Sequence, residues 1–167
     1  RDSFHAGVRS RIFLDFPELE LAGAYLALQG NTVLAERESW SRWRVSCNGR
    51  GIRLQSLSSG RVQHVGSRLE VRPYYGKFQL GAASFRGAAT LFASAQGCQA
   101  VNRVSIEDYL AGLVNAEFSS KWSWEAVKAQ VIAARSYALA RIEQNRHEKS
   151  RQWDVESTVR DQVYAGV

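Results

Sequence analysis

Apolar residues recur at helical spacing in the segment from residue 106 to about residue 115. Their positions are i, i+3, i+4, i+7 and i+8, which places them on one face of an α-helix. These residues are Ile106, Tyr109, Leu110, Leu113 and Val114. Ser105 precedes the stripe and is followed three residues later by Asp108, a spacing that resembles a capping box. The pattern therefore predicts a helix over 106–115 that begins after Ser105.

A second helix is predicted from Ser123 to about Gln144. Ser123 is a favourable N-cap residue, and Glu125 lies near the positive end of the helix that follows it. Many alanines give this segment a high helix propensity and a small surface for close packing. Residues seven apart on a helix differ by only about 20° in direction, so we expect Lys128 and Arg135 to form a cationic ridge.

The front of the chain alternates between apolar and polar positions, which is typical of β-strands. Segments 42–47 and 51–55 alternate on either side of Asn48-Gly49, a strong turn dipeptide, and predict a hairpin whose arginine face is solvated. Further strands are predicted over 12–16, 25–28, 62–65, 77–80, 89–92 and 99–104.

These elements predict an α+β fold, with a β-rich N-terminal half followed by two packed helices and the loop between them. We expect residues 1–97 to form a β-rich region packed on the core and residues 98–167 to form a helical core, with the softest boundary at 94–97. At 167 residues and 45% hydrophobic, the chain can bury roughly two thirds of its unfolded surface, enough for one sizeable core or two small abutting ones.

Basic residues outnumber acidic ones, with 22 Lys and Arg against 16 Asp and Glu and a formal net charge of +6. This excess indicates either a polyanionic partner or a basic surface that keeps the protein soluble. Because the sequence has no run of 18 apolar residues, we expect no transmembrane segment in this chain. The sequence also lacks methionine, even at position 1, which predicts a processed or excised chain.

Two cysteines, Cys47 and Cys98, are too few for a disulfide framework and lack the spacing of a metal site. Two buried free thiols are the favoured interpretation, and a disulfide is the alternative in an oxidising compartment. The three histidines, His5, His64 and His147, are scattered and suit ordinary surface or packing positions. We therefore expect neither a metal nor another cofactor.

Glu117 lies between the two predicted helices, in a connection that also contains Phe118, Trp122 and Trp124. We expect these aromatic residues to bury its carboxyl group partly, which favours the protonated form that a general acid needs. The alternative is an ordinary solvated glutamate beside tryptophans that pack in the core.

Short motifs with fixed spacing run from about residue 83 to the end of the chain. They are Phe85-Arg86-Gly87, Val101-Asn102, Ile106-Glu107-Asp108-Tyr109-Leu110 with Gly112, Glu117, Glu125-Ala126 with Lys128-Ala129-Gln130, Ala133-Ala134-Arg135-Ser136-Tyr137, Asp154, and Gln162-Val163-Tyr164 with Gly166. Together they resemble the core of the stage II sporulation protein D family, which includes bacterial cell-wall enzymes and relatives called amidase enhancers. The resemblance says little about residues 1–80.

The resemblance implies an exported lytic transglycosylase of the periplasm or cell surface. Such an enzyme cleaves the bond between N-acetylmuramic acid and N-acetylglucosamine in peptidoglycan and leaves an anhydro-muramic end. Its implied partners are denuded glycan strands, already stripped of stem peptides, and a cell-wall amidase that removes those peptides. By motif position, Glu117 is the catalytic acid and base, and Lys128 and Arg135 are supporting cations. The residues assigned to the substrate groove are Tyr137, Gln130, Gln162 and Tyr164.

A single carboxyl group suits this reaction. Ordinary glycosidases need two carboxyl groups, about 5 Å or about 6.5–9.5 Å apart, because a nucleophile or an activated water must attack. In a lytic transglycosylase the muramic 6-hydroxyl attacks its own anomeric carbon, so one glutamate gives and then takes the proton. Because a guanidinium touching Glu117 would weaken it as an acid, we expect Arg135 to bind the lactyl carboxylate of denuded muramic acid instead.

Several positions depart from the family pattern. The chain ends just after Gly166, where relatives continue with a segment that helps close the groove, so we expect a truncated or cleaved core. Phe118-Ser119 stands where Met and then Pro are common, and Ser136 where Thr is commoner, which affects the loop geometry more than the identity of the acid. Some relatives bind zinc through Cys and His, but this region offers only His147, so we expect no metal there.

Two other functions remain open. The chain could be an interaction module of the amidase-enhancer type, which binds cell wall or an amidase without catalysis and has no need of an acid at position 117. The charge also permits a basic nucleic-acid-binding domain, but the arginines are not clustered with aromatic residues in a recognisable binding motif. We therefore expect no nucleic-acid partner.

Overall fold

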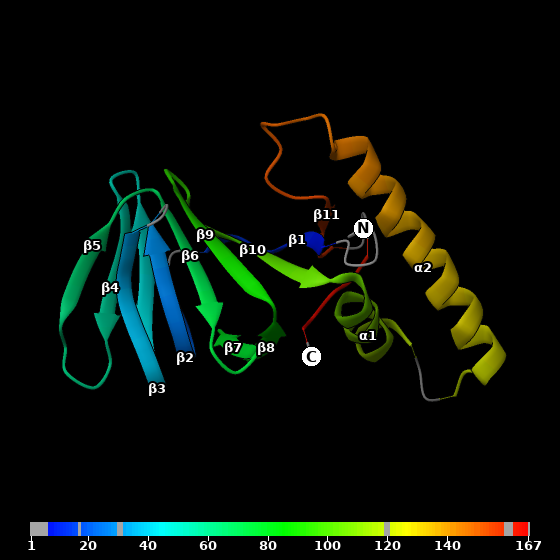
Figure 1. Cartoon of the computed structure of the whole chain (residues 1–167), viewed down its shortest axis with the longest axis horizontal. Helices are drawn as coiled ribbons and strands as arrows, with labels where there is room; N and C mark the ends of the chain where they lie inside the picture. The colour runs from blue at the N-terminus through cyan, green and yellow to red at the C-terminus, as the bar shows by residue number, and fades with distance from the viewer. Residues whose placement is uncertain (1–6, 17, 30–31, 119–120, 159–161, 167) are drawn as a thin grey trace.

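The computed structural model describes residues 7–16, 18–29, 32–118, 121–158 and 162–166 (Figure 1). The strands are β1 (Gly7–Phe16), β2 (Glu18–Gln29), β3 (Thr32–Asn48), β4 (Gly51–Ser56), β5 (Val62–Val65), β6 (Arg68–Pro73), β7 (Lys77–Leu80), β8 (Ala83–Arg86), β9 (Ala88–Ser94), β10 (Gly97–Ser105) and β11 (Val155–Glu156), and the helices are α1 (Ile106–Glu117) and α2 (Trp124–Asn145). This arrangement confirms the predicted α+β class with a β-rich N-terminal half.

All the strands belong to one sheet with the order β11-β1-β10-β9-β6-β2-β3-β4-β5, and β7 pairs with β2 and with β8. Neighbouring strands are antiparallel, except that β11 runs parallel to β1. Although β3 is four places from β10 in this order, it contacts both β10 and β9. The sheet therefore folds back on itself and encloses a core between its two halves.

A disulfide between Cys47 on β3 and Cys98 on β10 joins these two halves. The interpretation of two free thiols is therefore wrong. The contact of β3 with β10 places the two cysteines together, although they are 51 residues apart in the sequence. Cys98 is fully buried, so the bond lies within the folded sheet.

Helices α1 and α2 lie beyond β1 and β10, at the end of the molecule away from β5 (Figure 1). Both predicted N-caps are confirmed: Ser105 Oγ accepts a hydrogen bond from Asp108 N at 3.1 Å, and Ser123 Oγ accepts one from Ala126 N at 3.2 Å. The apolar stripe of α1 is largely buried, but only three residues of α2 are. Most of α2 therefore forms outer surface.

Each predicted strand is present, and the hairpin of β3 and β4 is confirmed. Its turn is shifted by one residue, because Asn48 pairs with Gly51 and its Oδ1 accepts from Arg50 N at 2.8 Å. Three strands were missed: β6, β8 and β11. The proposed boundary at 94–97 is the turn between β9 and β10, where Ser94 Oγ donates to the Gly97 carbonyl; the division of the chain into two parts stays a prediction.

Candidate functional site

Glu117 is the last residue of α1, and its side chain is exposed. Its Oε1 accepts a hydrogen bond from the backbone N–H of Val163 at 2.6 Å. Phe118 and Trp122 stack with ring centroids 5.3 Å apart, but Trp122 is 44% exposed and Trp124 is 70% exposed. The expected burial of Glu117 by these aromatic residues is therefore wrong.

The C-terminal segment that holds Glu117, residues 162–166, is packed closely on α1 and β8. A Cβ added at Gly112 of α1 would lie 2.4 Å from Tyr164 Cε2, so only glycine admits the tyrosine ring at this distance. Gly166 has a φ of +90°, and a Cβ there would lie 2.1 Å from the Ser84 carbonyl oxygen. These two glycines let residues 162–166 pass between α1 and β8.

Two of the predicted groove residues hold this segment in place. Tyr109 donates a hydrogen bond to Gln162 Oε1 at 2.9 Å, and Gln162 Nε2 donates to the Ala134 carbonyl at 3.4 Å. Burial raises the pKa of Tyr164, whose hydroxyl donates to Asn102 Oδ1 at 3.0 Å. Gln162 and Tyr164 therefore connect α1, α2 and β10 to the backbone that binds Glu117.

An open groove of about 350 Å³ lies between α1 and the start of α2. Its lining residues are Val114, Trp124, Val127, Lys128, Val131 and Ile132. Glu117 follows Val114 by three residues on α1, so the two side chains share one side of the helix. The predicted cation Lys128 is part of the groove: its Nζ lies 5.7 Å from the centroid of the Trp124 ring and 2.9 Å from Glu125 Oε1.

Arg135 lies farther along α2 and forms a two-pronged ion pair with Glu107, in the first turn of α1. The hydrogen bond from Arg135 lowers the pKa of Glu107. Glu107 and Glu117 are ten residues apart on α1, which corresponds to about 15 Å along its axis. Arg135 therefore does not contact the Glu117 carboxylate. The other predicted groove residues, Gln130 and Tyr137, are exposed on α2.

Asn102 is a framework residue whose role sequence analysis did not identify. It is fully buried on β10, and its Nδ2 donates to the carbonyls of Arg86 and Ala88 at 2.8 and 2.9 Å. Its Oδ1 accepts from Tyr164. A buried polar side chain in a strand usually has such partners. Asn102 therefore joins the turn between β8 and β9 to the C-terminal segment. The sequence signal for this role was the presence of Asn102 in the Val101-Asn102 motif.

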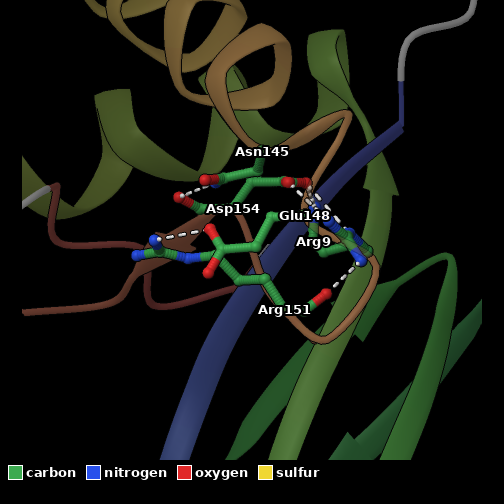
Figure 2. Close-up of polar contacts among 5 residues, drawn as sticks. All are labelled: Arg9, Asn145, Glu148, Arg151 and Asp154. Carbon is green, nitrogen blue, oxygen red and sulfur yellow. Dashed lines mark hydrogen bonds and ion pairs between the residues drawn. The ribbon is translucent and has the colours of Figure 1, made fainter.

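Asp154 is also a motif residue, but it lies away from Glu117, where the loop after α2 meets β1 (Figure 2). The buried carboxylate accepts from Arg9 N at 3.0 Å, Arg9 Nε at 3.2 Å and Arg9 Nη2 at 2.8 Å. Arg9 Nη1 donates to the Arg151 carbonyl, and Asn145 Nδ2 donates to the Asp154 carbonyl. Asp154 therefore fastens this loop to the sheet.

A larger hollow of about 590 Å³ lies against Trp40, Leu57 and Arg61 and contains none of the predicted site residues. Among the described residues, no group of three His, Cys, Asp or Glu side chains is placed to hold a metal ion. No helix in the described ranges is long and apolar enough to cross a membrane.

The residues around Glu117 lie in a segment that matches a known protein family. Residues 94–167 match the family described as SpoIID, stage II sporulation protein. An uncharacterized protein of Brachyspira hyodysenteriae is 44% identical over 66 residues, which cover 40% of this chain and 17% of that protein. No solved structure matches the chain. Over residues 94–167, which contain Glu117 and the framework around it, the chain is therefore similar to the stage II sporulation protein family.

Proposed function

We propose that this protein is an exported lytic transglycosylase that cleaves denuded peptidoglycan strands, with Glu117 as its acid and base. The observation that carries the proposal is the position of Glu117: its carboxylate is anchored by Val163 N–H, and it lies three residues after Val114, which lines the groove together with Trp124 and Lys128. The disulfide supports export, because disulfides persist in oxidising compartments.

The two carboxylate oxygens of Glu117 are in different situations. Oε1 accepts from Val163, whereas Oε2 has no hydrogen-bond partner among the described residues. The bonded oxygen fixes the orientation of the group, and the other oxygen carries the proton to be transferred. Exposure leaves that oxygen accessible to a glycan strand.

The reaction then needs no second carboxylate. Glu117 donates its proton to the glycosidic oxygen as the bond from that oxygen to the muramic anomeric carbon breaks. The muramic 6-hydroxyl attacks the same carbon, and the Glu117 carboxylate takes up the hydroxyl proton. Because the attacking group is part of the substrate, the entropic cost of bringing it in is small.

The groove offers a saccharide an aromatic ring and a nearby ammonium group. Trp124 is 70% exposed; the Lys128 ammonium lies over one face of its ring, and the other face suits the apolar face of a sugar ring. The pair of Lys128 with Glu125 is exposed and therefore weak, so an anionic group of the substrate can replace Glu125. Arg135 can bind a lactyl carboxylate by the same exchange, since its pair with Glu107 is also exposed.

A binding module without catalysis is the second candidate, and a specific observation favours it. The exposed Glu117 side chain already binds backbone, and in this candidate its role is to hold residues 162–166 on α1. The two candidate functions predict different effects of a substitution that removes the acid at position 117 but keeps an oxygen that accepts from Val163 N–H. Such a substitution abolishes cleavage by an enzyme and leaves a binding module unaffected.

The test compares the wild type with Glu117→Gln on denuded glycan strands. The amide oxygen of glutamine still accepts from Val163 N–H, so the fold and glycan binding are retained, while proton transfer is lost. We expect the wild type to release anhydro-muramic ends, detected by mass, and Glu117→Gln to be at least about 100-fold slower. Glu18→Gln, a change at an exposed ion pair on β2, is the matched control.

Other products would change the conclusion. Hydrolysed reducing ends would mean that a water attacks, and a second carboxylate would then be required. Absence of cleavage by the wild type, with glycan binding intact in both proteins, would favour the binding module.

A further inference from the structure

A second recessed surface lies on the outer face of the sheet, beneath the loop that follows α2. Three hollows of about 450, 420 and 360 Å³ all include Arg103 in their linings. We define the basic trough as this surface. Its cations are Arg9, Arg68, Arg72, Arg103, Arg146, Lys149 and Arg151, and its acids are Glu70, Glu148 and Asp154.

Strand register explains the shape of the trough. Arg9, Arg103 and Ala88 lie side by side on β1, β10 and β9, and Thr90 lies two residues after Ala88 on the same face. Arg68 flanks this face on β6. Small side chains on β9 therefore form the floor, and arginines on the neighbouring strands form its sides.

All three acids of the trough are already paired with cations. Asp154 binds Arg9, Glu70 binds Arg72, and Glu148 binds Arg151. In contrast, Arg68, Arg103 and Lys149 have no ion-pair partner among the described residues. Arg9 lies directly opposite Arg103, but its charge is neutralised by Asp154, so the unpaired charge belongs to Arg68, Arg103 and Lys149. The trough thus has an excess of positive charge that a bound anion would neutralise.

The loop that closes the trough is held firmly in place. Figure 2 shows Asp154 bound to Arg9 and the Arg151 carbonyl bound to the same guanidinium. The buried Asp154 and Asn145 thereby fix residues 146–154 against β1, and Lys149 is carried on this loop. A preorganised set of cations binds an anionic chain at lower entropic cost than flexible ones.

Nucleic acid fits this surface poorly. Binding of single strands relies on aromatic side chains on which bases stack. Phe92 is the aromatic residue in the trough linings, and the Arg68 guanidinium lies over its ring at 5.2 Å from the centroid. Arg68 therefore occupies a face of the Phe92 ring, whereas the guanidinium group of Arg103 remains suited to binding carboxylates.

We propose that the basic trough binds a carboxylate-bearing saccharide chain at a site separate from the groove at Glu117. Arg103 and Lys149 contact the carboxylates of the chain, while Arg68 lines the opposite side of the trough, on β6. The choice of a glycan as the chain rests on the proposed function. In that case the trough holds a denuded strand by its lactyl carboxylates while another part of the protein acts on it.

Binding is measured with denuded glycan strands in the Glu117→Gln background, so that strands are not cut during the experiment. We expect Arg103→Gln with Lys149→Gln to weaken binding by about tenfold, which corresponds to about 1.4 kcal/mol. The matched control, Arg50→Gln with Lys77→Gln, removes the same charge from two exposed cations outside the trough and should leave the affinity unchanged. Glycan whose carboxylates have been converted to neutral amides should lose the preference for the trough.

Three outcomes would overturn the proposal: equal weakening in the two double variants, unchanged binding of the amidated glycan, or tighter trough-dependent binding of polyphosphate or single-stranded DNA than of glycan. Glycan cleavage is then measured with the wild type and with the same trough and control variants carrying Glu117. This second assay tests the catalytic assignment independently of the trough assignment. If the wild type cuts strands but the trough variant binds normally, only the trough assignment fails. If the trough binds glycan but no strand is cut, only the catalytic assignment fails.

Discussion

Gly112 shows at the scale of one residue how the motif supports the site. It lies within α1, where alanine would improve helix propensity by about 1 kcal/mol. The Tyr164 ring and the Gly166 carbonyl oxygen occupy the space that a Cβ would need, at 2.4 and 2.7 Å. Glycine is therefore required at position 112 by the packing of residues 162–166, the segment that binds Glu117, and not by the helix itself.

Replacing Gly112 by alanine should destabilise the protein by about 1–3 kcal/mol, because an inserted methyl group must displace a buried ring and a backbone carbonyl. Urea unfolding would measure this change. Gly49→Ala is a suitable comparison, since nothing lies within 4 Å of its added Cβ. Equal stability of Gly112→Ala and the wild type would show that residues 162–166 are not packed against α1 as described.

The start of α1 is the element-scale feature that ties the helix to the sheet. Asp108 receives a hydrogen bond from Ser105 Oγ at 2.9 Å and pairs with Arg86 Nη1 of β8 at 2.7 Å. The hydrogen bond from Arg86, followed by that from Ser105, lowers the pKa of Asp108. An anion at this position also suits the positive end of the helix.

A lowered pKa in the folded state makes Asp108 stabilising above its unfolded pKa of about 3.9, and this contribution is lost as the pH falls through the lower folded value. Asp108→Asn should therefore cost about 1 kcal/mol at neutral pH and weaken the pH dependence of stability below about pH 4. Unfolding free energies measured from about pH 3 to pH 7 would test this. A variant with the same acid sensitivity as the wild type would contradict the assignment.

At the scale of the whole molecule, β10 connects the basic trough on the sheet to the groove between α1 and α2. β10 pairs with β1 and β9, contributes Arg103 to the basic trough, and leads directly into α1 and Glu117. The Cys47–Cys98 disulfide joins this same strand to β3. The position of β10 thus relates the helices to the β-rich part of the chain.

Because the disulfide closes a loop of about 50 residues, its loss should destabilise the protein by about 4 kcal/mol. We expect the Cys47→Ala, Cys98→Ala double variant and the reduced wild type to unfold at similarly lower urea concentrations. Reductant should not affect the double variant, which serves as the control. A wild type whose stability is indifferent to reductant would argue against the bond.

Local sequence patterns were sufficient to predict most helices and strands, but not the contacts of the site residues. The helix caps at Ser105 and Ser123 and the hairpin at Asn48 depend on residues close in the chain, so the sequence predicted them correctly. The exposure of Glu117 depends on where residues 162–166 pass, and the partner of Arg135 depends on how α1 and α2 pack. Neither feature has a signal in the neighbouring residues.

The sequence by itself determined the α+β class, the two helices with their caps and most strands, because these follow from periodicity and local hydrogen bonding. Only the tertiary structure decided that Cys47 meets Cys98, that Val163 anchors Glu117, and that Arg9, Arg103 and Lys149 line one trough. Those contacts join residues far apart in the chain, so they arise only when the sheet curves and the C-terminal segment returns to α1.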